Sequence, residues 1–138
     1  VLSGAVSPAD VPGLEGREFV LYAHQAGKAV RVDRAGSLAL SLPELDWEIV
    51  TLAPLQDGVA VIGLADKLNS GGAIQDLRHA SHRVLFRVRD GGELVLYADC
   101  APAQVTLDGV SVAMTYDRTA RLVSCVLPDA GAVAVEWA

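Results

Sequence analysis

The alternation of apolar and polar residues at every second position is the feature that most constrains the fold of this chain. Within residues 83–89, Val84, Phe86 and Val88 occupy one set of alternate positions, and three arginines lie in the other set. Successive side chains of a β-strand point to opposite faces, so this pattern is typical of strands with one buried face. The alternation recurs over residues 37–42, 93–99, 104–107 and 132–137. The sequence therefore predicts a protein built mostly of β-strands.

Turn-forming residues separate these runs and indicate how the strands are connected. Asp57-Gly58 and Asp108-Gly109 are Asp-Gly pairs, and Asp90 is followed by two glycines. Tight hairpins need positive φ at such positions, which Asp and especially Gly adopt readily. About eleven or twelve short strands, spaced by about ten residues, are typical of an antiparallel sandwich. We therefore expect an all-β fold, an antiparallel β-sandwich, without an amphipathic helix.

The length and composition fit one compact domain. Of the 138 residues, 51% are apolar and 20% are charged, so a sizeable hydrophobic core is expected. Residues 1–16 contain Pro8, Pro12 and three glycines, which favours an extended lead-in over a core element. We expect a single β-sandwich domain over residues 1–138. The chain does not begin with methionine, from which we expect that it starts inside a longer polypeptide or after processing or removal of a tag.

The charge balance excludes several classes of partner. Eleven basic and seventeen acidic residues give a formal net charge of −6. Nucleic-acid binding needs clustered Lys and Arg, so we expect no nucleic acid partner. We find no polybasic patch, no apolar run of about 20 residues and no signal peptide, so we expect no membrane association. Cys100 and Cys125 do not make a disulfide framework, and the cytoplasm is the default location.

No catalytic group stands out among the polar residues. The chain lacks the G-x-S-x-G motif of a nucleophilic serine. Glu44, Asp46 and Glu48 alternate along one segment, so their side chains would share a face. Glycoside hydrolysis uses two carboxyl groups about 5–10 Å apart. We favour the simpler interpretation, an acidic solvent-facing edge that discourages strand pairing.

A second polar cluster has the spacing of metal ligands. Asp76, His79 and His82 lie three residues apart, and on a helix they would share one face. We expect a strand or loop here, where this spacing does not bring side chains together. A solvated polar connection is therefore the favoured interpretation, and we expect no metal site and no cofactor.

Three residues are candidates for carbohydrate binding. Sugar rings pack on flat aromatic surfaces, and Trp47 and Trp137 have acidic neighbours that favour partial exposure. His24 ends an apolar run and is expected at its rim. A buried anchor with a hydrogen-bonded indole is the commoner fate of a Trp in a sandwich. Both interpretations of the tryptophans stay open at this point.

Four stretches, and a fifth with a weaker likeness at residues 116–123, occur in the same order as in a known enzyme family. The most specific is Ile62-Gly63-Leu64 followed by Leu68-Asn69-Ser70-Gly71-Gly72-Ala73-Ile74. The others are Leu2-Ser3-Gly4 with Asp10-Val11, Tyr22-Ala23-His24 with Gly27-Lys28, residues 48–54, and Tyr116-Asp117 before Leu122-Val123. In these motifs the chain resembles the C-terminal region of raffinose synthases, seed imbibition proteins and α-galactosidase-like enzymes, grouped with glycoside hydrolase family 36. It departs from the family pattern at Val61, in place of a proline, and at Asp66-Lys67, in place of an Asn-Met pair.

The resemblance implies a non-catalytic accessory domain. Enzymes of this family carry their catalytic aspartates on an upstream (β/α)8 barrel, a fold of about 250 residues, so no catalytic residue is expected in this chain. The expected partner is that barrel of the same polypeptide, from which residues 1–16 would lead. The residues expected to contact it are Leu2, Ser3, Gly4, Asn69, Ser70, Gly71 and Gly72.

Two other functional classes stay open. A carbohydrate-binding module for an α-galactoside sugar would need an exposed Trp or Tyr beside polar groups. A free-standing enzyme or an unrelated binding protein would need a perturbed pair of acids in a cleft. The choice between a hydrolase and a galactosyltransferase as the parent enzyme would be made in the barrel.

Overall fold

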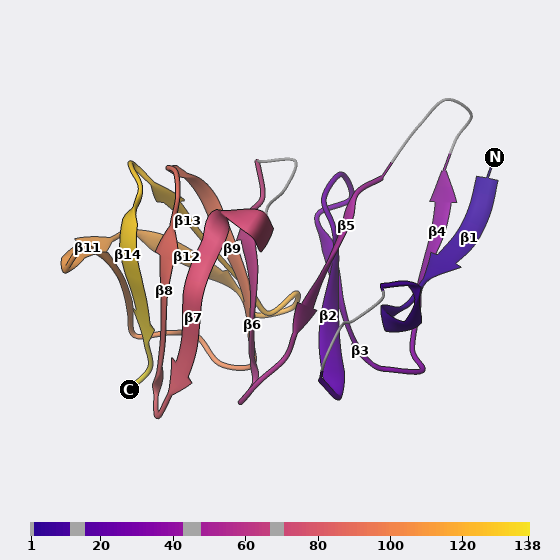
Figure 1. Cartoon of the computed structure of the whole chain (residues 1–138), viewed down its shortest axis with the longest axis horizontal. Helices are drawn as coiled ribbons and strands as arrows, with labels where there is room; N and C mark the ends of the chain where they lie inside the picture. Colours follow the sequence, from indigo (N-terminus) through magenta and orange to yellow (C-terminus); the bar gives the residue numbers. More distant parts are fainter. Residues whose placement is uncertain (1, 12–15, 43–47, 67–70) are drawn as a thin grey trace. The chain divides into compact units, whose positions relative to one another are not determined.

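The computed structural model describes residues 2–11, 16–42, 48–66 and 71–138, and they form an almost entirely β structure (Figure 1). The chain divides into two compact units, which we call unit 1 (Val1–Leu55) and unit 2 (Gln56–Ala138). All strand pairs are antiparallel in the part of the chain that is described. The expectation of a single domain over residues 1–138 stays a prediction, and each unit is treated separately below.

Unit 1 consists of two small sheets. Its strands are β1 (Leu2–Val6), β2 (Glu18–Ala23), β3 (Lys28–Asp33), β4 (Leu38–Leu42) and β5 (Val50–Pro54). They are arranged as a three-stranded sheet, β3-β2-β5, and a two-stranded sheet, β1-β4. Phe19, Leu21 and Ala23 alternate along β2 and form the core of the unit with Leu38. One face of β2 is thus buried in this core, and the strand is paired on both edges as the centre of its sheet.

The first residues of unit 1 are more ordered than a simple lead-in. The backbone of Leu2–Val6 is extended, as expected, but it pairs along its whole length with β4, and Val6 packs against the core. Pro8–Asp10 then forms a 3-10 turn, η1. Its Ser7 cap is reciprocal, because the Ser7 hydroxyl accepts from Ala9 N–H while Asp10 Oδ2 accepts from Ser7 N–H. Sequence patterning missed this strand because its partner lies more than thirty positions along the chain.

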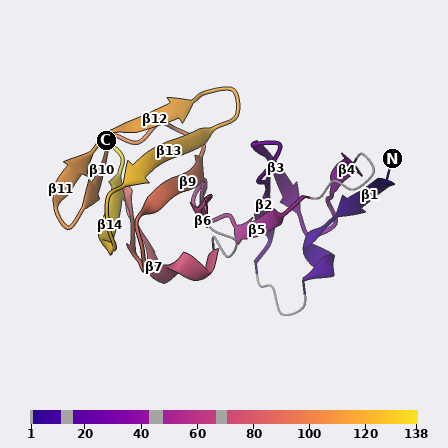
Figure 2. The ribbon, with the colours of Figure 1, turned by 90° about the horizontal axis from the view of Figure 1, so that it is seen from above.

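Unit 2 is a β-sandwich. Its elements are β6 (Val59–Leu64), η2 (Gly71–Ala73), β7 (Ile74–Ala80), β8 (Arg83–Val88), β9 (Gly92–Ala98), β10 (Gln104–Leu107), β11 (Val110–Val112), β12 (Met114–Asp117), β13 (Leu122–Leu127) and β14 (Gly131–Glu136). A five-stranded sheet, β11-β10-β14-β8-β7, faces a four-stranded sheet, β12-β13-β9-β6 (Figure 2). The inward side chains of both sheets form one core, which includes Phe86, Leu96, Val123 and Val133. The predicted antiparallel sandwich is confirmed.

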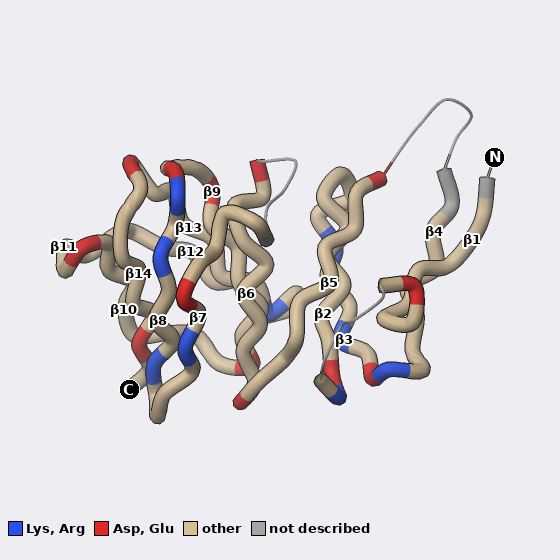
Figure 3. Tube along the Cα trace, in the orientation of Figure 1, with Lys and Arg blue, Asp and Glu red and all other residues tan. Residues whose placement is uncertain are grey.

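The alternation that led to this prediction is visible in β8. Val84, Phe86 and Val88 are at most 4% exposed, while Arg83 and Arg87 are exposed. Figure 3 shows the basic positions of β8 in blue, and the neighbouring strand β7 carries the acidic Asp76 and the basic Arg78. The strand therefore has one face in the core and one charged face in water.

The Asp-Gly pairs form the tight turns that were predicted. Asp57 and Gly58 have φ values of 52° and 77°, and Asp108 and Gly109 have 49° and 82°. Positive φ at both central positions is typical of the hairpin turn that matches the twist of antiparallel strands. Gln56 and Val59 exchange two backbone hydrogen bonds of 3.0 Å across the first turn. None of the described residues belongs to a helix of the length and apolarity that a membrane crossing requires.

Candidate functional site

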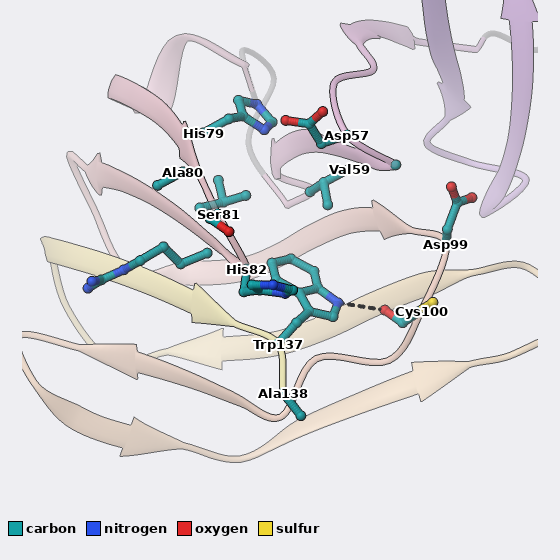
Figure 4. Close-up of a pocket in the computed structure, with 13 residues that line it drawn as sticks. Asp57, Val59, His79, Ala80, Ser81, His82, Asp99, Cys100, Trp137 and Ala138 are labelled. Atoms are coloured by element: carbon teal, nitrogen blue, oxygen red, sulfur yellow. Dashed lines mark hydrogen bonds between the residues drawn. The ribbon is translucent and has the colours of Figure 1, made fainter.

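A pocket of about 670 Å³ lies at one end of the unit 2 sandwich (Figure 4). Four segments form its wall: the turn at Asp57-Gly58, the β7–β8 turn at Ser81-His82, Asp99-Cys100 after β9, and Trp137-Ala138 after β14. These segments lie close together because the antiparallel order places the start of β6 and the ends of β7, β9 and β14 at one end of the sandwich. The pocket is therefore a product of topology, built from strand ends that are distant in sequence.

Two hydrogen bonds hold Trp137 at the wall of this pocket. Its Nε1–H donates to the carbonyl oxygen of Cys100 at 2.8 Å, and its backbone N–H donates to the carbonyl oxygen of His82 at 2.8 Å. The side chain is half-buried and packs against the unit 2 core. The indole N–H of Trp137 is therefore hydrogen-bonded, as expected of an anchor. The same indole also lines the pocket.

His79 lines the pocket, and its ring nitrogen Nδ1 is buried without a hydrogen-bond partner among the described residues. Burial lowers the pKa of this imidazole below its usual value of 6.5, and the nearby Asp57 carboxylate opposes that shift. Desolvation therefore favours the neutral form of the His79 imidazole.

The three residues with ligand-like spacing do not form a metal site. His79 and His82 line the same pocket, but Asp76 lines a separate groove on the outer face of the five-stranded sheet. Asp76 sits in a β-bulge of β7 with a φ of 55°, and His82 occupies the β7–β8 turn with a φ of 60°. Within the described residues, no group of three or more His, Cys, Asp or Glu could hold a metal ion.

Two exposed carboxylates border the pocket. Asp99 Oδ1 lies 3.1 Å from the Arg121 guanidinium, and the Asp99 backbone N–H donates to the carbonyl oxygen of Gly58 at 2.9 Å. A Cβ at position 58 would lie 2.6 Å from Asp99 Oδ2, so any larger residue there would displace this carboxylate. Asp57 lies in the adjacent turn, and in Figure 4 its carboxylate points toward the ring of His79. The sequence marked Asp57 only as a turn residue.

His24 has partners within unit 1. It follows β2, where its Nε2 shares a hydrogen bond of 2.6 Å with Thr51 Oγ1. Its ring also meets the ring of Tyr22 edge to face, with centroids 4.9 Å apart. These contacts give His24 a role in holding β2 to β5. Trp47, the third candidate for sugar binding, lies outside the described residues.

Glu48 is the described member of the acidic trio, since Glu44 and Asp46 lie outside the described residues. Its carboxylate accepts from the backbone N–H groups of Gln25, Ala26 and Ile49 at 2.8, 3.1 and 2.9 Å. Glu48 thereby closes the turn between β2 and β3. Its hydrogen bonds give it a structural role that the alternation of acids did not predict.

The segments expected to contact a barrel lie in both units. Ser3 and Gly4 are exposed on β1, after Leu2, and a Cβ added at Gly4 would meet nothing within 4 Å. Gly71 and Gly72 begin η2, which leads into β7, while Asn69 and Ser70 lie outside the described residues. The glycine at position 4 is thus not required by packing among the described residues.

The two cysteines differ in environment. Cys100 is exposed at the rim of the pocket, and Cys125 is buried in the unit 2 core. Burial raises the pKa of the Cys125 thiol to about 11. Because the thiolate is the reactive form, Cys125 is a structural thiol.

Comparison with known proteins assigns the chain to a family. Residues 5–127 match the family described as raffinose synthase or seed imbibition protein Sip1. The chain is 33% identical over 119 residues to a galactinol–sucrose galactosyltransferase of Pisum sativum, an alignment that covers 80% of this chain and 15% of that protein. A probable galactinol–sucrose galactosyltransferase 6 of Arabidopsis thaliana is 32% identical, with 78% and 15% covered. Stachyose synthase of Pisum sativum is 27% identical, with 69% and 12% covered.

These matches confirm the resemblance found in the sequence motifs. They run through most of this chain, yet the chain spans only about 15% of the length of the first of these relatives. The motifs that carry the resemblance include residues of β1, β2, β5, β6, η2, β12 and β13, so the likeness reaches both units. With the family match over residues 5–127, this chain belongs to the raffinose synthase or seed imbibition protein family.

Proposed function

We propose that this chain is a non-catalytic accessory β-domain of a larger enzyme that acts on α-galactosides, where it packs on a catalytic (β/α)8 barrel of the same polypeptide. The observation that carries the proposal is coverage: the chain aligns over most of its length with galactosyltransferases but covers about 15% of each. A (β/α)8 barrel takes about 250 residues, so the catalytic part of such an enzyme lies outside this sequence.

The chemistry of unit 2 supports a non-catalytic role. Retaining and inverting glycosidases place two carboxyl groups on opposite sides of the scissile bond, one acting as acid and the other as nucleophile or base. The two carboxylates at the pocket are both exposed, and Asp99 is committed to Arg121 and to the backbone at Gly58. Two of these relatives are named galactosyltransferases and the third is named stachyose synthase. In this proposal the parent enzyme is a galactosyltransferase or a glycoside hydrolase.

The exposed strand β1 and the turn η2 are the proposed contacts with the barrel. Gly4 leaves open space on an exposed strand surface, and Gly72 is exposed beside the residues that open β7. Glycine allows the backbone of a neighbouring domain to approach closely. The proposed contact set is Leu2, Ser3, Gly4, Asn69, Ser70, Gly71 and Gly72.

Gly4→Val tests this contact, because it can be compared in two contexts. In the 138-residue chain we expect no loss of unfolding free energy, since a Cβ at position 4 meets nothing and valine favours strands. In the full-length enzyme the same change should lower the melting temperature and the galactosyl-transfer or hydrolysis rate. An unchanged full-length enzyme would remove β1 from the contact. Full activity and stability after deletion of the whole chain would overturn the accessory role.

A carbohydrate-binding module is the second candidate function. The observation that favours it is the pocket beside Trp137, which combines an aromatic ring with carboxylate and imidazole groups. The assay that separates the two functions is sugar binding by the chain in the absence of any barrel.

A further inference from the structure

Residues 110–117, which we call the β11–β12 edge, lack the features that normally prevent an exposed strand from pairing. β11 is the last strand of the five-stranded sheet and β12 is the last strand of the four-stranded sheet (Figure 2). Residues 110–116 carry no charge, and the whole edge contains no proline and no glycine. An uncharged segment that contains Val, Thr and Tyr pairs readily with another strand when it lies at a sheet edge.

Two other edges of the described structure do carry protective features. β7, at the opposite side of the five-stranded sheet, contains a bulge with Asp76 at a φ of 55° and the charged Arg78. β3, at one side of its three-stranded sheet, carries Lys28, Arg31 and Asp33. Bulges and charged side chains are common means of blunting an exposed edge. β11 and β12 pair with their neighbours without a register shift, so their outer sides are left open to a further strand.

Two apolar grooves flank the β11–β12 edge. One of about 340 Å³ is lined in part by Val112, Met114 and Val126. The other, of about 540 Å³, is lined in part by Val110, Val112 and Pro128. Val110 and Val126 are 70% and 71% exposed, the largest exposed fractions among the large hydrophobic side chains of the described residues. Clustered apolar surface that is exposed in this way marks a contact with another protein segment.

The charges at the two grooves indicate which partner fits. The charged side chains that line them, among the described residues, are Glu93, Asp108 and Asp129, and all three are acidic. A second copy of this chain paired along the same edge would bring acidic groups toward acidic groups, which disfavours self-association. An extended apolar segment with Lys or Arg at its ends complements both the grooves and their charge.

We propose that the β11–β12 edge pairs with an extended segment of the parent polypeptide that lies outside this chain. The segment adds a strand beside β12, places apolar side chains in the two grooves and presents Lys or Arg to Glu93, Asp108 and Asp129. The inference rests on the proposed function, because the chain covers about 15% of its galactosyltransferase relatives and the remaining length supplies the strand. It adds a contact whose residues and chemistry differ from those of β1 and η2.

Hydrogen–deuterium exchange of the 138-residue chain and of the full-length enzyme, followed by mass spectrometry, tests the pairing. Amides of the β11–β12 edge should exchange at least about tenfold more slowly in the full-length enzyme, because the added strand bonds the outward-facing groups. A peptide that covers β10 is the internal control, since β10 is paired on both sides and should exchange slowly in both samples. Equal exchange of the edge in the two samples would overturn the proposal.

Val126→Lys connects the grooves to this contact. In the 138-residue chain the new ammonium group would lie opposite Glu93, the cross-strand partner of position 126, so the urea unfolding midpoint should stay unchanged. In the full-length enzyme the same change removes an apolar contact and repels the basic groups of the partner, so the melting temperature should fall. Leu77→Lys is the matched control, because Leu77 is 45% exposed in the bulge of β7, and it should leave that temperature unchanged. Equal effects of the two variants would contradict the assignment of the grooves.

The mass of the 138-residue chain in analytical ultracentrifugation tests the alternative occupant. We expect a monomer, since a self-paired edge would oppose acidic groups. A dimer that either Val110→Lys or Val126→Lys converts to a monomer would overturn the proposal in favour of a second copy. If both lysine variants leave the full-length enzyme unchanged while Gly4→Val or deletion of the chain impairs it, the edge contact fails and the accessory role stands.

Discussion

At the scale of single residues, two Asp-Gly turns show how backbone conformation and packing both contribute to the requirement for glycine. Gly58 and Gly109 have φ values of 77° and 82°, a region that disfavours any residue with a Cβ. They differ in surroundings, because a Cβ at Gly58 would collide with Asp99 Oδ2, whereas one at Gly109 would meet nothing within 4 Å. Sequence reasoning predicted the turns from their Asp-Gly pairs, but not the close approach of Asp99.

Gly58→Ala should therefore destabilise the chain more than Gly109→Ala. The backbone strain of alanine at positive φ is about 1–2 kcal/mol in both variants. Gly58→Ala adds the displacement of Asp99, which also weakens its ion pair with Arg121, and we expect about 1 kcal/mol more. Urea unfolding of the two variants side by side measures the difference. Equal losses would show that Asp99 moves aside without a penalty.

His79 provides a pH-dependent property at the same scale. Its pKa in the folded chain lies below the unfolded value of 6.5, so the unfolded chain binds more protons between these two values. Stability should rise with pH through that window and fall as the solution is acidified through it. Because Asp57 raises the pKa of His79, Asp57→Asn should lower it further. Histidine ring chemical shifts followed against pH measure both effects, and a His79 pKa above 6.5 would contradict the assignment.

At the scale of elements, alternation predicted the strands that have one wet face and failed where both faces are covered. In β8 the buried residues Val84, Phe86 and Val88 recur at every second position, and Leu85 is the one apolar residue of the strand outside this set. In β6 every residue from Val59 to Leu64 is buried, so the sequence shows an unbroken apolar run without a period. The strand β1 was missed for a different reason, because its pairing with β4 depends on a contact distant in sequence.

Neighbouring positions of β8 should respond very differently to truncation. Phe86→Ala removes a ring that is 3% exposed in the sandwich core, and we expect a loss of about 3–5 kcal/mol of unfolding free energy. Arg87→Ala alters an exposed position of the same strand and should change stability by no more than about 0.5 kcal/mol. Denaturant unfolding provides both values. A large loss at Arg87 would mean that the outer face of this sheet is also packed.

At the scale of the whole chain, the pocket could not be predicted because its wall comes from four separate parts of the sequence. Asp57, His79 and Trp137 each gave a local signal, as a turn residue, a ligand-like histidine and a candidate sugar platform. Only the antiparallel topology of unit 2 brings them together. His24, which the sequence grouped with Trp137, belongs instead to a hydrogen-bonded pair within unit 1. His24 and Trp137 were both predicted as candidate sugar-binding residues from their residue types, but the topology places them in different units.

The sheet arrangement also predicts an order of local opening, which hydrogen exchange can measure. In unit 2, β9 lies between β13 and β6, and Leu94 and Leu96 are fully buried, so its amides should exchange most slowly. In unit 1, β2 lies between β3 and β5 and should be well protected. The β1–β4 pair has only two strands, an arrangement that is marginally stable alone, so its amides should exchange first. In the full-length enzyme the proposed barrel contact should slow exchange in β1 while leaving β9 unchanged. Protection of β1 equal to that of β2 in the 138-residue chain would contradict this order, because the pair would then owe its stability to the chain alone.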